Sequence, residues 1–566
     1  MIKKASIQKN LEITTFNEFI NKVDYSFMDN LEADPESSSD GNDYIPRQVF
    51  SGHYVPVKPT PLSAPEYLAH SKNLFKELGL SDLLLQDKDF LRIFSGDLSN
   101  VKKPMRKFGW ATGYALSIYG KEYNQQCPFK TGNGYGDGRA ISIFEGIFKG
   151  KRWEIQLKGS GPTPYCRGGD GRAVLRSSIR EFLAQELMHS LGIPTSRSLT
   201  LCLSKTDTIL RPWYKKNSIE IEPDIILENK AAISTRVAPS FLRIGQIELF
   251  ARRAKNNSHK NALKELKLIV KRLIDINYNQ DINTNLPFKK QIIELASLYR
   301  KRLISLVADW IRVGYCQGNF NSDNCALGGY TLDYGPFGFC ELFDPNFQPW
   351  TGGGNHFSFL NQPLAAEINF KMFINSLKPL LENEENLLER LNHIQEGFYN
   401  SMQDEMKIMW TKKLGLKNYD DHLINNLFQL MITTKVDYTK FFRLLSDIPK
   451  EITPLKKSFY KDCSSEIESL WNNWLNTWNN SLRDCDLKKI SADMKKVNPR
   501  YIWREWIIAF AYEAAEKGDL NLIKDLQIAF DNPYDDLTID FQNKFDLLRP
   551  IKFFNKAGIS HYSCSS

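Results

Sequence analysis

The sequence predicts an α+β fold of two lobes with an additional helical region at its C-terminal end, and three observations predict it. The 566 residues are too many for one ordinary hydrophobic core. Strand-like runs gather between positions 140 and 203, whereas apolar residues at helical spacing dominate after Arg252. We therefore expect an N-terminal region and first lobe over residues 1–250, a second lobe over 251–375 and a helical extension over 376–566.

The stretch before residue 140 is predicted to be mostly loop and extended chain. Residues 32–43 are acidic, rich in serine and nearly free of apolar side chains, which is typical of a mobile loop. The prolines between 56 and 65 favour an extended segment. Residues 66–78 have the apolar spacing of a helix that Gly79 ends, and residues 121–134 form a polar, glycine-containing insertion.

The other predicted elements of the first lobe are a hairpin, a helix and a strand. The hairpin joins the strand-like runs 140–148 and 153–157 through a short Lys-Gly-Lys turn. The helix covers residues 173–191, where apolar side chains recur at helical spacing, and it ends at Gly192. A further short strand covers residues 199–203.

The rest of the chain is predicted to be mainly helical. One strand-and-turn island interrupts it at residues 318–340, and helices return from about Leu364 to the end. Trp471, Trp474 and Trp478 recur at three- and four-residue steps, which favours a buried helix face over a stripe that stacks on a ligand.

Composition narrows the class of protein. The 74 basic and 66 acidic residues leave a mild net charge of +8, and no basic run is interleaved with aromatic residues, so we expect no nucleic-acid partner. The nine cysteines are scattered and never form a C-x-x-C pair, which indicates reduced thiols rather than zinc ligands. We find no secretory signal and no span long enough for a bilayer. These features predict a soluble, cytoplasmic monomer without a membrane partner.

The first chemical signal is a lysine at the end of a strand. Lys158 closes the second strand of the hairpin and precedes Gly-Ser-Gly, and Glu181 lies on the following helix. Protein kinases position a cation on ATP phosphates in this way, because the glutamate fixes the ammonium group and keeps it charged in a partly dry cleft. The alternative is a surface lysine and a surface glutamate on unrelated elements.

The sequence Gly-Asp-Gly-Arg occurs twice, at 136–139 and at 169–172. The first copy precedes the hairpin, where a kinase-like lobe places its phosphate-covering loop; glycines let backbone N–H groups approach phosphate oxygens, and the arginine can neutralise them. The second copy opens the helix that carries Glu181 and offers a positive helix end to an anion. For either copy alone, the alternative is a tight turn. The candidate ATP-binding residues in the two copies are Gly136, Gly138, Arg139, Asp170 and Gly171.

The third signal lies at residues 317–335, where Gln-Gly-Asn-Phe-Asn-Ser-Asp-Asn precedes Leu-Asp-Tyr-Gly. Kinases carry an aspartate, four residues, an asparagine and then Asp-Phe-Gly; the asparagine and the second aspartate hold magnesium. Asn324 and Asp333 fit those two metal roles. The position of the usual catalytic aspartate holds Asn319, so Asp323 is the remaining candidate base. The alternative is an ordinary turn rich in Asn and Asp.

Two arginines complete the candidate site. Arg236 and Arg243 bracket a short, mostly apolar segment, and guanidinium groups bind phosphate oxygens in pairs. We count both as ATP-binding candidates, and the alternative for each is a surface ion pair.

Taken together, these motifs resemble the selenoprotein O family of pseudokinase protein adenylyltransferases. The matching strings follow the family's order from about Pro46 to the end, so the resemblance covers nearly the whole chain, and the central string is long and specific. The strings are IPRQVFSGHYVPVKPTP, GDGRA, LKGSGPTPYCRGGDGRAVLRSSIREFLAQELMHSLGIPT, RVAPSFLRIG, GNFNSDN, TLDYGPFGF and SCSS.

The resemblance implies a protein-kinase-like, two-lobed fold in which ATP lies reversed, with its α-phosphate toward the acceptor. AMP would pass to a Ser, Thr or Tyr hydroxyl of a protein substrate with Mg²⁺ or Mn²⁺ as cofactor, and pyrophosphate would leave. Glu181 would hold Lys158, Asn324 and Asp333 would bind the metal, and Asp323 would act as the base. The implied ATP-binding set is Gly136, Gly138, Arg139, Lys158, Asp170, Gly171, Arg236, Arg243 and Asp333.

Three segments depart from the family pattern. Gln317 stands where the family usually has histidine, for which we expect a modest effect on rate at most. Residues 117–134 replace a Gly-His-Gln-Phe-Gly segment, which affects the shape of the glycine loop. Some bacterial members pair the C-terminal cysteine with one in the loop after Asp-Tyr-Gly; residues 347–354 contain no cysteine, so Cys564 is a candidate redox residue without an assumed disulfide.

Three other functions stay open. One is an ordinary phosphotransferase that uses Asp323 as its base, and another is Mn²⁺-dependent transfer of UMP. The third is an inactive nucleotide-binding or redox-regulated scaffold. Lys158, Glu181, Asn324 and Asp333 argue against the scaffold, because an inactive protein has no need for a full metal set.

Overall fold

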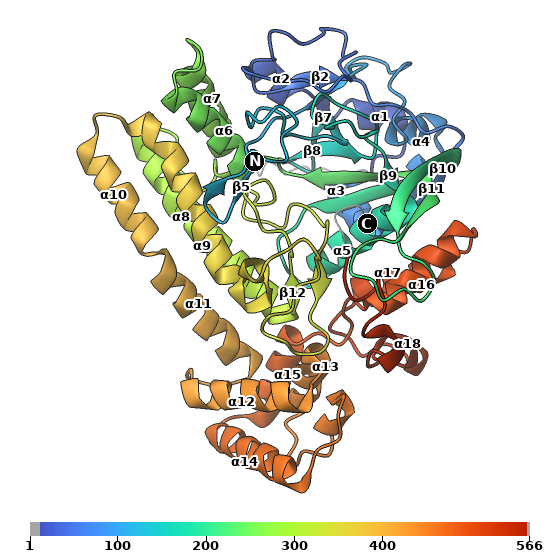
Figure 1. Ribbon diagram of the computed structural model, residues 1–566, viewed down its shortest axis with the longest axis vertical. Helices are drawn as coiled ribbons and strands as arrows, with labels where there is room; N and C mark the ends of the chain where they lie inside the picture. The colour runs from blue at the N-terminus through green and yellow to red at the C-terminus, as the bar shows by residue number, and fades with distance from the viewer. Residues whose placement is uncertain (1–11, 563–566) are drawn as a thin grey trace, which may run out of the picture.

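The computed structural model describes residues 12–562, and its largest element is a nine-stranded sheet in which every pair of strands is antiparallel (Figure 1). The main path runs β2-β4-β7-β8-β11-β10-β3, with β1 paired to β7 and β9 paired to β11. The strands are β1 (Val23–Asp24), β2 (Val55–Val57), β3 (Pro65–His70), β4 (Gly109–Ala111), β7 (Ala140–Phe148), β8 (Lys151–Lys158), β9 (Ala173–Val174), β10 (Arg197–Trp213) and β11 (Ile225–Ala238).

The predicted hairpin is confirmed as β7 and β8. Phe148 pairs with Lys151 at the turn, and Ala140 pairs with Lys158 at the open end. Lys149 and Gly150 both have positive φ, 46° and 78°, which is the conformation whose twist suits a two-residue hairpin. The register places Lys158 at the last position of β8, beside the end of the first Gly-Asp-Gly-Arg motif.

The helix predicted over residues 66–78 is wrong in its first half. Residues 65–70 form β3 on the outer edge of β10, and only Lys72–Leu78 forms a helix, α3, which ends at Gly79 with φ 76°. The Ser71 side chain accepts a hydrogen bond from the N–H of Leu74 and so fixes where α3 begins. Pairing with an exposed strand edge therefore overrides the helical spacing of the sequence.

Strands β10 and β11 extend the predicted sheet considerably. The short strand expected at 199–203 is the inner part of the 17-residue β10, and β11 is not among the predicted strands. The predicted loop at residues 32–43 is free of helix and strand, yet Asp34 in it is buried and pairs with Arg47 at 2.5 Å.

Helix α5 (Leu175–Ser190) packs against β10 and β11 and carries Glu181. It was predicted over 173–191, but residues 173–174 form β9 instead. The second Gly-Asp-Gly-Arg motif therefore leads into a short strand, which corrects the expectation that it opens the helix.

The helices that follow β11 form the remainder of the molecule, as predicted, and the island at 318–340 is mostly turns next to the short pair β12–β13. Figure 1 shows α8 to α11 along the left side, α12 and α14 at the bottom, and α16 and α17 beside the sheet at the right. The remaining elements are α1 (Phe16–Ile20), α2 (Ser26–Asn30), α4 (Lys88–Phe94), β5 (Ser117–Ile118), β6 (Lys121–Glu122), α6 (Ile244–Lys255), α7 (Ala262–Asn277), α8 (Phe288–Val313), β12 (Tyr315–Cys316), β13 (Gly338–Phe339), α9 (Gln362–Leu377), α10 (Glu385–Glu396), α11 (Phe398–Lys413), α12 (Asp421–Thr434), α13 (Tyr438–Leu445), α14 (Ser465–Ser481), α15 (Leu487–Val497), α16 (Glu505–Glu516), α17 (Asn521–Asp531) and α18 (Ile539–Phe545).

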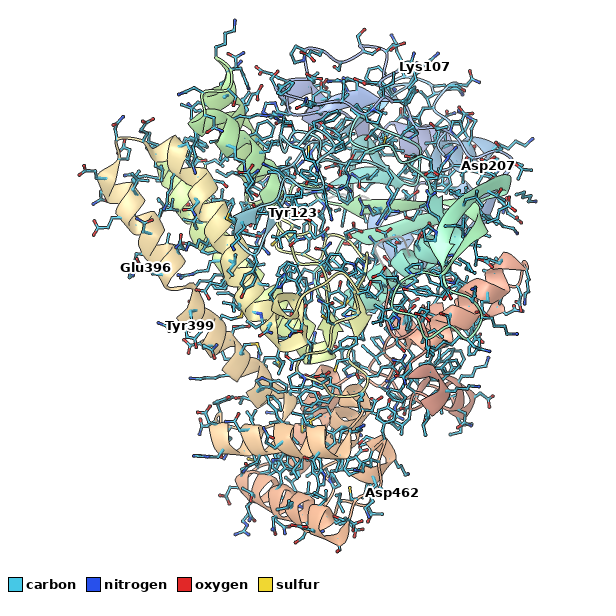
Figure 2. The ribbon with its side chains drawn as sticks, in the orientation of Figure 1. Lys107, Tyr123, Asp207, Glu396, Tyr399 and Asp462 are labelled. Carbon is cyan, nitrogen blue, oxygen red and sulfur yellow. The ribbon has the colours of Figure 1, made fainter. Side chains whose placement is uncertain are left out.

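The tryptophan stripe on α14 is buried, as predicted. Trp471, Trp474 and Trp478 are 0%, 5% and 0% exposed and belong to a second apolar core formed by the lower helices. By contrast, Figure 2 shows Glu396 and Tyr399, at the junction of α10 and α11, on the outer side of the molecule. Across residues 12–562, no helix is both long and apolar enough to cross a membrane.

Eight cysteines lie in the described part of the chain, and all eight are free thiols, as expected. Cys564 lies outside the described residues.

Candidate active site

A cavity of about 440 Å³ brings the three predicted signals together. The two Gly-Asp-Gly-Arg motifs, the ends of β8 and β11 and the 323–333 island all contribute to its wall. Eleven candidates line it, namely Gly136, Gly138, Arg139, Lys158, Asp170, Gly171, Arg236, Arg243, Asp323, Asn324 and Asp333. Glu181 does not line the cavity but lies directly behind it, in contact with Lys158.

The lysine–glutamate pair is present. Lys158 Nζ lies 3.0 Å from Glu181 Oε2 and 2.6 Å from Asp333 Oδ1, and the lysine and glutamate side chains are 9% and 3% exposed. The lysine therefore joins a helix, a strand and the distant island at one point. Each of the two carboxylate partners offsets part of the desolvation cost of the buried ammonium group.

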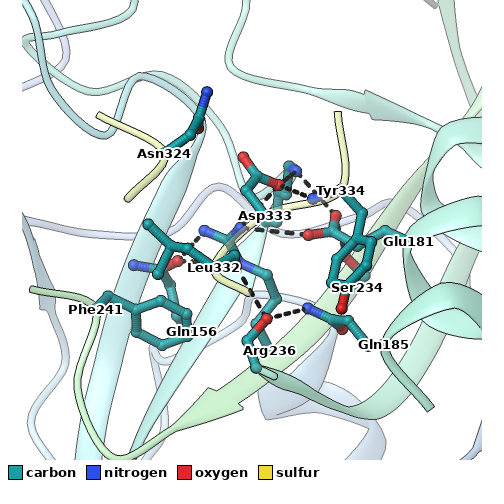
Figure 3. Close-up of polar contacts among 12 residues, drawn as sticks. Gln156, Glu181, Gln185, Ser234, Arg236, Phe241, Asn324, Leu332, Asp333 and Tyr334 are labelled. Carbon is teal, nitrogen blue, oxygen red and sulfur yellow. Dashed lines mark hydrogen bonds and ion pairs between the residues drawn. The ribbon is translucent and has the colours of Figure 1, made fainter. Parts of the chain in front are cut away.

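Arg236 adds a second cation to the same cluster. Its Nη1 lies 3.3 Å from Glu181 Oε1 and 3.3 Å from Asp333 Oδ1, and its Nε donates to Gln156 Oε1 at 3.1 Å (Figure 3). Burial alone would raise the pKa of Asp333, but Lys158 and Arg236 together hold it well below its usual range. Asp333 is therefore a carboxylate at any physiological pH.

Asp323 has the opposite electrostatics. Burial raises its pKa to about 6, although the positive charges of Arg243 and Arg167 oppose that rise. Its Oδ1 is buried and accepts no hydrogen bond from any residue between 12 and 562. A carboxyl group with a free oxygen and a pKa near neutrality is suited to accept a proton. Asn319, at the position of the usual kinase aspartate, is not part of the cavity wall.

Arg243 connects two segments of the cavity wall. It is 6% exposed, and its guanidinium donates to Asp137 Oδ1 at 2.9 Å and to the Asp323 carbonyl at 3.3 Å. The other oxygen of Asp137 accepts from Thr112 Oγ1 at 2.6 Å. The aspartate of the first Gly-Asp-Gly-Arg motif is thus bound to the protein, while the glycines beside it face the cavity.

Both glycine motifs are also tightly packed turns. A Cβ at Gly136 would lie 2.4 Å from the Tyr165 ring, and one at Gly171 would lie 2.1 Å from the Gly161 backbone. Asp170 accepts two hydrogen bonds from Arg211, at 2.5 and 2.9 Å. The alternative interpretation as tight turns is therefore correct for these positions. The same residues also line the cavity, so the two interpretations are compatible.

Four charged wall residues were missed as candidates. Asp137, Arg167 and Arg172 lie in or beside the glycine motifs, so the motifs themselves were the available signal. Arg211 lies in the outer part of β10, which was not predicted as a strand, so no local pattern pointed to it.

The residues proposed for the metal leave suitable oxygens free. Asn324 Nδ2 donates to the Asn319 carbonyl at 2.9 Å, so its amide oxygen is available, and within residues 12–562 Asp333 Oδ2 has no hydrogen-bond partner. The described residues contain no cluster of three or more His, Cys, Asp or Glu side chains that could hold a metal. One amide and one carboxylate oxygen fit Mg²⁺, which binds to few protein groups and takes its other ligands from phosphates and water.

Comparison with known proteins identifies the family of the chain. The sequence model of the family described as protein adenylyltransferase SelO matches residues 38–530. Proteins named protein nucleotidyltransferase YdiU from Aromatoleum aromaticum and from Flavobacterium johnsoniae are each 34% identical to the chain. Each alignment covers 96% of this chain and 99% of the relative. The chain therefore belongs to the SelO family of protein adenylyltransferases and is a protein nucleotidyltransferase.

Proposed function

We propose that this protein transfers AMP from ATP to a Ser, Thr or Tyr hydroxyl group of a protein substrate and releases pyrophosphate. In this proposal the cavity is the cleft of a protein-kinase-like, two-lobed fold, and ATP lies in it with the α-phosphate toward the acceptor. The three-part division at residues 250 and 375 belongs to the same proposal.

The position of Asp323 is the observation that supports this proposal most strongly. The usual kinase base is replaced by Asn319, which lies outside the cavity wall, whereas Asp323 lies in the wall with a free, buried oxygen. The acceptor hydroxyl gives its proton to Asp323 while the hydroxyl oxygen forms a bond to the α-phosphorus. The bond between the α-phosphorus and the bridging oxygen breaks, and that oxygen leaves with pyrophosphate.

The cations of the cavity are suited to bind the pyrophosphate that leaves. Lys158, Arg236 and Arg139 lie on the Asp333 side, where they would bind the β- and γ-phosphates and stabilise the charge that develops on pyrophosphate. Asn324 and Asp333 would hold the metal ion through their free oxygens. A bound Mg²⁺ or Mn²⁺ supplies further neutralisation of phosphate charge.

The test compares ATP labelled at the α-phosphate with ATP labelled at the γ-phosphate, each with Mg²⁺ and bulk cell protein. We expect label in protein from the α-position only, and we expect Asp333→Ala to abolish it, because the variant removes a metal ligand and the partner of two cations. Label from the γ-position only would identify a phosphotransferase and refute the reversed nucleotide. Absence of transfer from both would favour the inactive scaffold, and α-labelled UTP with Mn²⁺ tests for UMP transfer.

A further inference from the structure

The cavity wall carries seven cationic side chains, and five of them are bound to other parts of the protein. Lys158 and Arg236 contact Glu181 and Asp333, and Arg243 contacts Asp137. Arg211 is bound to Asp170, and Arg172 donates to the carbonyls of Thr60 and Pro61 at 2.7 and 2.8 Å. Of the seven, only Arg139 and Arg167 have side chains with neither a hydrogen bond nor an ion pair to any residue between 12 and 562.

The two free arginines enter the cavity wall from neighbouring turns, since a Cβ at Gly138 would lie 3.0 Å from the Cα of Cys166. Arg139 is close enough to Asp333 to lower its pKa, whereas Arg167 is close enough to Asp323 to oppose the rise of its pKa with burial. Arg139 thus lies on the side of the metal ligand. Arg167 lines the same cavity as the candidate base Asp323.

The backbone at Arg167 is held in a conformation that arginine rarely adopts. Arg167 has φ 52° and Gly168 has φ 84°, and the N–H of Gly169 donates to the Cys166 carbonyl at 2.8 Å. This tight turn has positive φ at both central positions, where Asn and Gly are the favoured residues. Strained positions of this kind concentrate at functional sites, because stability would select another residue there.

The turn holds Arg167 over the cavity without fixing its side chain. The guanidinium carbon lies 5.7 Å from the centre of the Tyr135 ring, next to the first glycine motif. Residues 167–170 are all exposed, and a Cβ at Gly168 would meet no atom within 4 Å. The side chain therefore has room to turn toward a bound phosphate.

We propose that Arg167 is a catalytic residue that binds the non-bridging oxygens of the α-phosphoryl group while that group passes to the acceptor hydroxyl. This inference rests on the proposed function. The guanidinium donates hydrogen bonds to the non-bridging oxygens, which carry negative charge while the bond to the acceptor oxygen forms and the bond to the bridging oxygen breaks. Its contribution is largest in the transition state, so its loss lowers kcat more than it weakens ATP binding.

The informative variant is Arg167→Asn, because asparagine is better suited than arginine to the positive φ. We expect an unfolding temperature equal to or above that of the unchanged protein, since the substitution relieves strain. We expect kcat for transfer of α-label to fall by about 100-fold, the usual effect of removing one donor from a developing anion. The Kd for a non-hydrolysable ATP analogue should change by less than about threefold, because five bound cations remain in the wall.

Arg167→Ala and Arg167→Lys complete the test. Added guanidinium ion at millimolar concentration should restore part of the activity of Arg167→Ala, which a structural role would not allow. Arg167→Lys should recover only part of kcat, because an ammonium group cannot donate two parallel hydrogen bonds. The control is Arg390→Gln on the exposed face of α10, for which we expect unchanged transfer.

Failure of this inference is distinguishable from failure of the proposed function. If the unchanged protein transfers α-label and Arg167→Asn does so equally fast, the role of Arg167 is refuted and AMP transfer stands. If Arg167→Asn loses ATP affinity by the same factor as kcat/KM, the residue only binds the ground state and the catalytic role is wrong. If the unchanged protein transfers no α-label, both proposals are overturned.

Discussion

Two carboxylates of the cavity carry opposite electrostatics although both are half-buried. Asp333 is surrounded by Lys158 and Arg236 at 2.6 and 3.3 Å, and their charges outweigh its desolvation. No cation among residues 12–562 directly contacts the carboxyl oxygens of Asp323, so desolvation dominates and its pKa rises to about 6. Pairs of groups whose environments separate their pKa values are typical of sites that assign one group to charge stabilisation and the other to proton transfer.

The raised pKa of Asp323 predicts a pH dependence. In the proposed mechanism Asp323 accepts a proton as the carboxylate, so activity should be full above about pH 7 and should fall as the pH drops through about 6, by tenfold per unit below that value. The measurement is kcat/KM for transfer of α-label between pH 4.5 and 8.5. Asp323→Asn should lower the rate at every pH and remove the acidic limb, whereas an unchanged limb in that variant would assign the titration to another group.

At the scale of single elements, α14 shows how a sequence pattern becomes a core. Trp474 and Trp478 lie four residues apart and stack with ring centres 6.1 Å apart, while Trp471 meets Phe441 and Phe459 from other elements. Each tryptophan removes a large apolar surface from water. The Trp478 indole N–H also donates to the Leu414 carbonyl at 2.9 Å, so its one polar group is satisfied.

Replacing Trp478 by alanine should destabilise the lower helices without touching the cavity. We expect a loss of about 3–5 kcal/mol in the free energy of unfolding, because the side chain is fully buried and leaves a large void. Urea unfolding followed by circular dichroism measures it, and ATP affinity at 25 °C should be unchanged. Leu470→Ala, at a position 48% exposed on the same helix, is the control and should cost less than about 0.5 kcal/mol. Equal losses in the two variants would contradict a buried stripe.

At the scale of the whole molecule, the C-terminal helices contact the helix behind the active site. Arg180, next to Glu181 on α5, pairs with Glu505 at the start of α16 at 3.0 Å, with side chains 4% and 7% exposed. The same guanidinium donates to the Phe337 carbonyl at 3.3 Å, four residues beyond Asp333. One buried arginine therefore joins α5, the metal-side segment and the C-terminal region.

Glu505→Gln should weaken this connection. A buried arginine that loses its carboxylate costs about 3–5 kcal/mol of stability, and we expect lower kcat as well, because α5 positions Glu181 against Lys158. Thermal unfolding and transfer of α-label measure the two effects. The double variant Arg180→Met with Glu505→Leu should regain most of the stability, because removing both charges leaves no unpaired ion. A double variant as unstable as the single one would show that the pair does not act as a unit.

The sequence by itself determined the features that local chemistry controls. The β7–β8 hairpin, the C-cap at Gly79, the tryptophan face of α14 and the helical character after β11 follow from side-chain periodicity and from backbone preferences within a few residues. Family membership was also readable from the sequence, because the motif strings are long and occur in a fixed order.

Only the tertiary structure decided which groups of the site are bound and which are free. Lys158 and Asp333 are 175 residues apart in sequence, and Arg211 and Asp170 are 41 apart, so no local pattern reveals that the first pair fixes the metal-side carboxylate or that the second occupies Asp170. The same holds for β3, where the edge of a distant strand outweighs helical spacing. Burial is likewise a property of the assembled chain, and it is burial that raises the pKa of Asp323 in the wall of the cavity.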